Sequence, residues 1–428
     1  MTPPGRPAAR PVGDLTSGRS SWRAARLALG TAAALGLGRF AYGLVLPAMA
    51  TDLHWDLARA GALTTANGFG YLAGALAAAP VTRRIGPAAA YRLGMVAGAA
   101  ALAANAIDAG YPPLLAARAL AGLAGALVFV AGAVLSPTPI FFAGTGLGIA
   151  VSGATIPPLL DGHPSRWPLA WLGLALAAAL ATAASWGAAR PAPAAGVQPP
   201  RSPVRPLWLV AVAYLLFAAG YIAYITFLSA YLDQRAAPAA QEALTWTLLG
   251  AAVIAAPILW RRPIARWPGG LALAAPLGAI AVSGALPLLT PLPAVVVLSA
   301  LGYGAAFMAV PAAVTAIVRA RAAAPPAPVR LRPGVGAIVV RRASVAPGPG
   351  VGDRAGAEAR MATRMGAFTA IFAAGQTAGP WLAGILADRT GPGATLAWTA
   401  ALCAAGGLLA LLTRPGPTSR PGQPEQHS

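Results

Sequence analysis

The stretch GLGRFAYGLVLPAM (residues 36–49) places one arginine, Arg39, inside a long apolar run. The charged residues nearest to it along the chain are Arg26 and Asp52. The run between them exceeds the roughly 20 residues that a helix needs to cross a membrane. A charge inside such a helix is costly in lipid and normally faces neighbouring helices or a water-filled cavity. The stretch therefore predicts a membrane-spanning helix that carries a candidate functional cation.

The rest of the chain has the same character. Of its 428 residues, 57% are hydrophobic and only 10% are charged, against roughly a quarter charged in soluble domains. The apolar residues form twelve blocks that are too long for barrel strands and suit helices, which satisfy their own backbone in lipid. We therefore predict an all-α polytopic membrane protein with twelve transmembrane helices. The blocks lie near 26–50, 60–80, 88–107, 112–134, 139–160, 168–188, 206–231, 243–260, 270–290, 293–318, 364–386 and 394–413.

The basic residues indicate an orientation. All 31 are arginines, and they recur between the apolar blocks instead of forming one patch, which argues against a nucleic-acid partner. If the blocks alternate in direction, almost all the loop arginines fall on one side, and cytoplasmic loops are the ones enriched in basic residues. Both termini are therefore expected in the cytoplasm. The opposite side holds only Arg59, Arg166, Arg235 and Arg389.

These blocks divide the chain into two halves. Residues 320–362 are rich in proline, glycine and arginine, so we expect a disordered cytoplasmic insertion there. Its arginines suit anionic lipid headgroups, although an ordinary extended loop is the simpler interpretation. The single cysteine, Cys403, excludes a disulfide within the chain. The expected organisation is a tail at 1–25, a six-helix half at 26–188, a linker at 189–205, a second half at 206–413 and a tail at 414–428.

The two halves share sequence patterns. GRFAYGLVLPA (38–48) and GYIAYITFLSA (220–230) match at a glycine, an alanine and a tyrosine, with an offset of 182. A Gly/Gly/Pro pattern within 144–158 recurs within 366–380 with an offset of 222. The larger offset is expected if 320–362 is an insertion in the second half. The matches favour a six-plus-six repeat, which is typical of transporters.

At this point the chain resembles a known family. The opening stretch, ANGFGYLAGAL (66–76) and GQTAGPWLAGILADRTG (375–391) are similar to the YbfB/YjiJ-type branch of the bacterial major facilitator superfamily. The resemblance implies two pseudo-symmetric six-helix halves, a central cavity lined mainly by helices 1, 4, 7 and 10, and rocker-switch alternating access. It also implies a multi-pass monomer of the bacterial inner membrane and a co-transported proton. It does not fix a substrate.

Some superfamily patterns are altered here. The loop after the second helix normally reads Gly-x-x-x-Asp-Arg-x-Gly, but this chain has APVTRRIG (79–86), in which an arginine replaces the acid. An acid-to-arginine latch at that loop is therefore in doubt. A glycine and Gly-Pro pattern that resembles the one in helix 5 of antiporters is kept better in the eleventh block. The resulting candidates for gating or conformational change are Arg84, Gly86, Gly375, Gly379 and Pro380.

The candidate substrate site starts from two arginines. Arg39 and Arg118 lie at similar depths in their helices, and if helices 1 and 4 line one cavity, the two guanidiniums face each other across it. No acidic residue lies in the middle of a predicted helix to neutralise Arg39. Guanidinium groups suit a carboxylate or phosphate. The alternatives are that Arg39 binds backbone carbonyls at a broken helix, and that Arg118 has a gating role. Further candidates are Tyr42, Asn67, Tyr221, Tyr224, Tyr303 and Gln376.

These features lead to a functional hypothesis. We expect a secondary active transporter of a small organic solute, with an anion favoured, whose partners are that solute and the lipid bilayer. Proton coupling is a family-level expectation for which no carboxylate is evident. The alternative is a non-transporting membrane sensor or lipid-binding protein with 320–362 as its output. No cluster of catalytic or metal-ligating residues is present in the sequence, so no enzyme activity, metal or cofactor is predicted.

Overall fold

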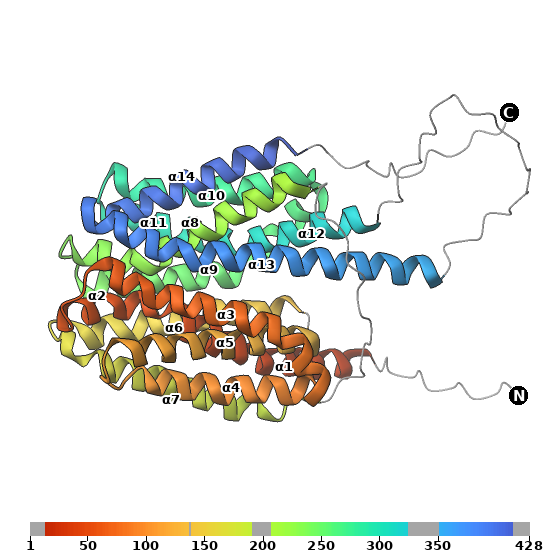
Figure 1. The fold of residues 1–428 in the computed structure, drawn as a ribbon, viewed down its shortest axis with the longest axis horizontal. Coiled ribbons are helices and arrows are strands. Elements are labelled where there is room, and N and C mark those ends of the chain that lie inside the picture. The colour runs from red at the N-terminus through yellow and green to blue at the C-terminus, as the bar shows by residue number, and fades with distance from the viewer. Residues whose placement is uncertain (1–12, 137, 191–206, 324–350, 414–428) are drawn as a thin grey trace, which may run out of the picture.

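A computed structural model describes residues 13–136, 138–190, 207–323 and 351–413. These residues form helices and connecting turns, and no strand occurs among them. Most of the helices run along the long axis of one bundle (Figure 1). The N-terminal half contains α1 (Gly13–Thr31), η1 (Ala32–Phe40), α2 (Tyr42–Asp52), α3 (Leu57–Ile85), α4 (Pro87–Ala104), α5 (Tyr111–Leu135), α6 (Pro139–Leu160), η2 (Pro164–Arg166) and α7 (Trp167–Trp186). The C-terminal half contains α8 (Trp208–Asp233), α9 (Ala239–Arg266), α10 (Gly269–Leu289), α11 (Pro293–Phe307), α12 (Ala309–Ala323), α13 (Val351–Thr390) and α14 (Gly393–Leu411).

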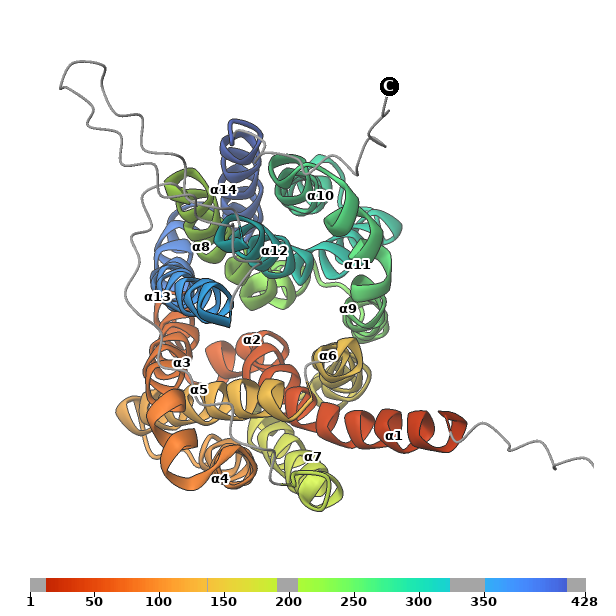
Figure 2. The ribbon, with the colours of Figure 1, turned by 90° about the vertical axis from the view of Figure 1, so that its right-hand side faces the viewer.

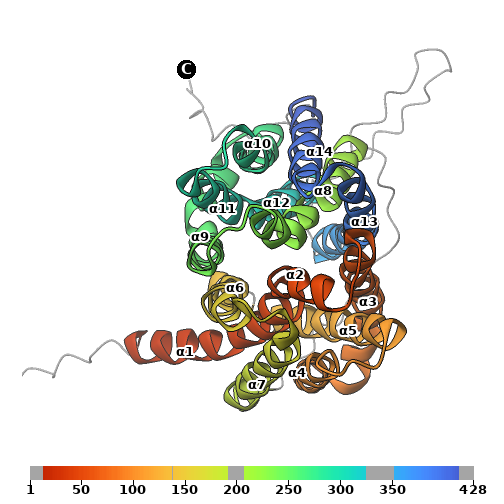
Figure 3. The ribbon, with the colours of Figure 1, turned by 90° about the vertical axis from the view of Figure 1, so that its left-hand side faces the viewer.

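Each half packs mainly on itself. Within the N-terminal half α5 lies against α3 and α4, and within the C-terminal half α14 lies against α8 and α10. The two halves meet where α3 packs on α13, α6 on α9, and α2 on α8. Seen along the long axis, α1 to α7 form one group and α8 to α14 the other (Figures 2 and 3).

The apolar helices confirm an all-α polytopic membrane protein. Eleven helical stretches of the described residues are long and apolar enough to cross a membrane. The helix α3 is not among them, although it is 29 residues long and packs between α5 and α13. Three arginines and several polar residues lower its hydropathy. The count of twelve spans therefore stays a prediction.

The segments expected to be irregular are helical at their ends. Residues 13–25, predicted as a tail, begin α1, while 320–323 end α12 and 351–362 begin α13. The prediction of disorder over all of 320–362 was therefore wrong at both ends. The sequence RAGAEARMATRMGA that follows Asp353 is rich in alanine, arginine, methionine and glutamate and has no proline, which favours a helix. Residues 1–12, 191–206, 324–350 and 414–428 lie outside the described parts, and so does most of the predicted linker.

The bundle has two distinct ends. At one end, α1 begins, α7 ends, α8 begins, α13 begins and α14 ends (Figure 1). We call it the arginine-rich end, because the arginine-rich connections join there. The other, the arginine-poor end, holds the turn between α2 and α3. The 40 residues of α13 span about 60 Å, twice the thickness of a bilayer core. Its first part accordingly projects beyond the bundle at the arginine-rich end (Figure 1).

Glycines allow the two halves to approach closely. A Cβ added to Gly250 on α9 would lie 2.6 Å from the carbonyl oxygen of Gly146 on α6. A Cβ added to Gly61 on α3 would lie 2.7 Å from the carbonyl oxygen of Pro380 on α13. Small residues at such crossings are typical of packed membrane helices, because the backbones themselves come into contact.

Candidate functional site between the two halves

Two spans are interrupted where the halves meet. The first span changes from an α-helix to the π-helix η1, which ends at Phe40, and resumes as α2 after Ala41. The tenth expected span breaks at Met308, between α11 and α12. The rings of Phe40 and Phe307, which precede the two breaks, meet edge to face at 5.8 Å. Interrupted membrane helices commonly line substrate sites, and π segments are frequent at functional positions.

Arg39 reaches from the N-terminal half to the C-terminal half. Its Nη2 donates a hydrogen bond of 2.8 Å to Oε1 of Gln376 on α13. The hydroxyl of Tyr221 on α8 donates to the same oxygen at 3.3 Å. The guanidinium lies 5.2 Å from the ring centroid of Tyr71 and 5.9 Å from that of Phe40. The structure thus brings together three of the eight predicted substrate residues.

This group has hydrogen-bond donors without acceptors. Nε and Nη1 of Arg39 and Nε2 of Gln376 are buried and have no hydrogen-bond partner. Each buried, unsatisfied polar group costs about 1–3 kcal/mol, and more if it is charged. The aromatic faces compensate only part of that cost for Arg39. All three orphaned atoms carry N–H groups, so one oxygen-rich anion would satisfy them.

Arg118 makes different contacts from those expected of it. Its Nη1 donates to the carbonyl oxygen of Gly38 at 2.8 Å, and its Nη2 donates more weakly to that of Arg39 at 3.5 Å. Its guanidinium lies over the rings of Tyr42 and Trp171. Arg118 therefore binds the backbone at the end of η1 instead of facing Arg39 across a cavity. Carbonyl binding at a broken helix was the alternative considered for Arg39.

Asn67 and Tyr42 support this arrangement. Asn67 Nδ2 donates to the backbone oxygen of Arg118 at 3.1 Å, which ties α3 to α5. The hydroxyl of Tyr42 donates to the backbone oxygen of Ala60 at 2.7 Å. The ring of Tyr42 packs beside the guanidinium of Arg118. These two side chains position the helices around Arg39.

Tyr224 and Tyr303 form a second polar cluster. Their rings stack at 4.1 Å. The hydroxyl of Tyr303 donates to the backbone oxygen of Tyr221 at 2.6 Å, and the hydroxyls of Tyr224 and Ser299 share a hydrogen bond of 2.7 Å. Both tyrosine hydroxyls are thus used inside the C-terminal half, and that of Tyr303 binds the backbone of Tyr221.

A column of aromatic rings was missed from the sequence. On α8, Tyr214, Phe217 and Tyr221 stack in succession, and the ring of Phe372 on α13 packs beside all three. Phe307 continues the column from Tyr221, with the two rings 5.9 Å apart and nearly parallel. The spacing of three and four residues along α8 is a helical-face signal that predicts part of this column.

A polar latch joins the halves at the arginine-poor end. The carboxylate of Asp388 on α13 accepts hydrogen bonds from the backbone N–H groups of Leu57 at 2.7 Å and Ala58 at 3.0 Å. Asp56 caps the same helix by accepting from Arg59 N at 2.6 Å. Carboxylates stabilise a helix N-terminus through its free N–H groups and its dipole. The N-terminus of α3 is therefore capped in part by the other half.

The sequence signal for this latch lies in GILADRTG (384–391), which keeps the Gly-x-x-x-Asp-Arg-x-Gly spacing. Of the predicted gating residues, Pro380 lies against Gly61 at the boundary between the halves. Gly375 and Gly379 instead pack against the backbone of α8, inside the C-terminal half.

The remaining gating candidates lie at the arginine-rich end. Gly86 ends α3 with a φ of 80°, a backbone conformation that favours glycine. Arg84 is exposed in the last turn of that helix. Their positions fit a helix end, and their predicted gating role stays a prediction.

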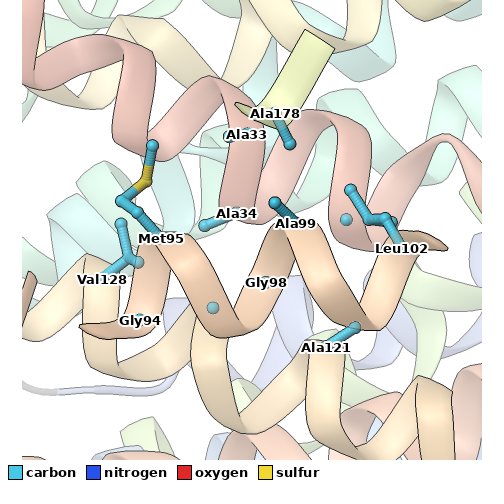
Figure 4. A pocket seen from close by; sticks show the side chains of 12 residues that line it. Ala33, Ala34, Gly94, Met95, Gly98, Ala99, Leu102, Ala121, Val128 and Ala178 are labelled. Carbon is cyan, nitrogen blue, oxygen red and sulfur yellow. The ribbon is translucent and has the colours of Figure 1, made fainter. Parts of the chain in front are cut away.

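The candidate residues are closed off from water in this conformation. Arg39 is 5% exposed and Gln376 is 0% exposed. One cavity, of about 10 Å³, lies between η1, α4, α5 and α7 and is lined by glycines and apolar side chains (Figure 4), so it has room for about one water molecule. Another, of about 340 Å³, lies at the arginine-poor end of the C-terminal half. Neither includes Arg39 or Gln376.

Comparison with known families agrees with this architecture. The family described as uncharacterised MFS-type transporter YbfB matches residues 31–338, more than half of the chain. A comparison with curated proteins gives no match. The match and the apolar helices together confirm the resemblance in the sequence. The chain belongs to the major facilitator superfamily of membrane transporters, in the YbfB-type family.

Proposed function

We propose that this transporter moves a small organic anion by rocker-switch alternating access. The observation that supports it is the contact between Arg39 and Gln376, because it spans the two halves and leaves three buried donor nitrogens without acceptors. A membrane-embedded cation normally marks a substrate or ion path. Among the described residues, no carboxylate contacts Arg39. The substrate would supply that missing negative charge.

The orientation follows from the arginines. With the arginine-rich end in the cytoplasm of a bacterial inner membrane, the Asp388 latch lies at the outer face. The latch and the glycine contacts at Gly61 join the halves on that side. The conformation described is therefore closed to the outside. Rocking of the halves would break the latch and expose Arg39 to outside solution.

Proton coupling has one candidate group. Glu242 lies in the first turn of α9, and its Oε1 is buried without a hydrogen-bond partner. One turn further along, Trp246 packs against Gly43 of α2 and Gly153 of α6 in the other half. A carboxylate in that position would gain or lose its proton as the two halves separate, so it is suited to carry the coupled proton.

Ligand-induced thermal stabilisation tests the proposal. The purified protein is incubated with acetate, succinate, citrate, benzoate and phosphate, and with choline and putrescine as cations. At least one organic anion should raise the melting temperature of the wild type and of Arg166→Gln, a matched loss of an exposed arginine. Arg39→Gln should lose that response. Stabilisation by the cations alone, or an equal response to anions in Arg39→Gln, would overturn the proposal.

A further inference from the structure

Two contacts between the halves, made by neighbouring residues, lie at the centre of the molecule. Arg39 binds Gln376 through a polar hydrogen bond, and Phe40 packs its ring against Phe307 of the other half. Both contacts must be broken or replaced for a solute to lie between the halves. A ligand that bridges them needs a polar acceptor at one end and an apolar, ring-shaped surface beside it.

We infer that the substrate is an aromatic monocarboxylate, an inference that rests on the proposed function and names its substrate class. Its carboxylate takes the position of the Gln376 oxygen on Arg39, and its ring takes the position of the contact between Phe40 and Phe307. Gln376 is thus an internal ligand that occupies the anion position when no substrate is bound.

The donors fit a planar carboxylate. One carboxylate oxygen replaces Oε1 of Gln376, which now accepts from Arg39 Nη2 and from the Tyr221 hydroxyl. The second oxygen accepts from Nε or Nη1 of Arg39, and the displaced amide nitrogen of Gln376 is a further donor. A guanidinium fork matches the two oxygens of a carboxylate in one plane.

The charge fits a monoanion. Arg39 is the cation whose contact crosses to the other half, whereas Arg118 directs Nη1 and Nη2 to backbone oxygens of η1 and lies over the rings of Tyr42 and Trp171, with its Nε buried and unpartnered. In the described part of the chain, the aromatic column around Tyr221 brings no further cation to this position. A second negative charge on the ligand would therefore enter an apolar region without a partner, which is costly.

The surroundings fit an aromatic body. Tyr221 and Phe307 are nearly parallel at 5.9 Å, and Phe217 stacks on Tyr221 at 4.7 Å. On the other side, Phe40 and the ring of Tyr71 flank Arg39. A flat ring attached to the carboxylate would contact rings from both halves, and such contacts add stabilisation beyond the burial of apolar area. A short aliphatic acid would fill the anion position and leave the aromatic surface uncovered.

The test compares ligands and variants by thermal stabilisation of the purified transporter. The ligands are benzoate, phenylacetate, acetate, succinate, inorganic phosphate and the neutral benzamide. Wild type should bind benzoate or phenylacetate most tightly and should not respond to benzamide. Phe307→Leu should weaken the binding of aromatic acids about fivefold. Phe142→Leu, a matched change in the N-terminal half, should leave their binding unchanged. Phe40→Leu repeats the test from the other half if Phe307→Leu does not fold.

Two outcomes distinguish a failure of this inference from a failure of the proposed function. If succinate or acetate stabilises the wild type through Arg39 while aromatic acids do not, the substrate class is wrong and the organic-anion transporter stands; stabilisation by phosphate alone contradicts both. If no anion stabilises the wild type, both the inference and the proposed function fail. Gln376→Glu adds a permanent carboxylate beside Arg39, so it should abolish the response to benzoate while the protein remains folded; a retained response would contradict the internal-ligand role.

Discussion

Arg39 of the N-terminal half donates a hydrogen bond of 2.8 Å to Gln376 of the C-terminal half, and both side chains are buried. This bond crosses the boundary along which the halves of a rocker-switch transporter separate. It also leaves Nε and Nη1 of Arg39 without acceptors. The pair therefore combines a cation that has unpartnered nitrogens with an uncharged side chain, which in the proposed function the substrate carboxylate replaces.

The role of Gln376 as an internal ligand predicts that a variant of this residue affects net transport more than substrate exchange. In Gln376→Leu, the substrate still binds Arg39, but the empty carrier must close with a buried cation that has lost the acceptor Oε1 of Gln376. Counterflow exchange in proteoliposomes should therefore persist, while net uptake should fall by about tenfold or more, since a hydrogen bond to a charged group contributes about 1.5–3 kcal/mol. Equal losses in both assays would show that Gln376 does not assist the empty carrier.

The two buried arginines should differ in their effect on stability. Arg118 binds backbone oxygens at the end of η1, so Arg118→Met should lower the free energy of unfolding by about 2 kcal/mol. Arg39 has two unpartnered nitrogens, so Arg39→Gln should leave stability unchanged or increase it. Thermal unfolding of the two variants beside the wild type measures this. A larger loss in Arg39→Gln than in Arg118→Met would reverse the assigned roles.

The Asp388 latch should control access from the arginine-poor end. Asp388→Ala removes two hydrogen bonds to the N-terminus of α3, a contribution of about 0.3–2 kcal/mol, and should favour the conformation that opens there. An introduced cysteine, Phe227→Cys in a Cys403→Ala background, reports this through its rate of labelling by a membrane-impermeant maleimide, because Phe227 is buried beside Gly61.

Labelling of that cysteine should be faster in Asp388→Ala than in Asp161→Ala, a matched loss of an exposed carboxylate at the same end. Identical labelling rates would mean that the carboxylate caps α3 without holding the halves together.

The proposed role of Glu242 as proton carrier predicts how transport depends on a proton gradient. Because its buried Oε1 has no partner, Glu242→Gln should keep the shape of the side chain and remove the titratable proton. Benzoate accumulation driven by a pH gradient should then be lost, while counterflow, which needs no gradient, should continue. Gradient-driven accumulation at the wild-type rate would exclude Glu242 as the proton carrier.

Much of the fold follows from the sequence, because each apolar block must satisfy its own backbone in lipid and the arginines order the loops. The ends of α1 and α13 were less predictable. In those segments arginine and glycine are interspersed among residues that favour a helix. The helix therefore continues beyond the apolar block, and hydropathy alone does not show where it begins.

The site was predictable in its residue types and less so in its contacts. Arg39 stood out because a charge is rare inside an apolar span, and Gln376 and Tyr221 were candidates as uncharged side chains with polar groups in such spans. The hydrogen bonds of Arg118 to the backbone oxygens of Gly38 and Arg39 lie at the end of the π-helix η1, which no periodicity reveals. The Asp388 latch joins residues more than 300 positions apart, and a single sequence does not encode such pairings directly.

Counterflow exchange tests the central claim, that Arg39 binds the organic anion that the protein carries across the membrane. Proteoliposomes are loaded with unlabelled benzoate, phenylacetate, succinate or citrate and diluted into the same labelled compound. Wild type and Arg166→Gln should take up at least one labelled anion, and Arg39→Gln should exchange it at least about tenfold more slowly, as expected for losing charge-assisted hydrogen bonds. Exchange by Arg39→Gln at the wild-type rate, or no exchange of any of the four anions by the wild type, would contradict the account.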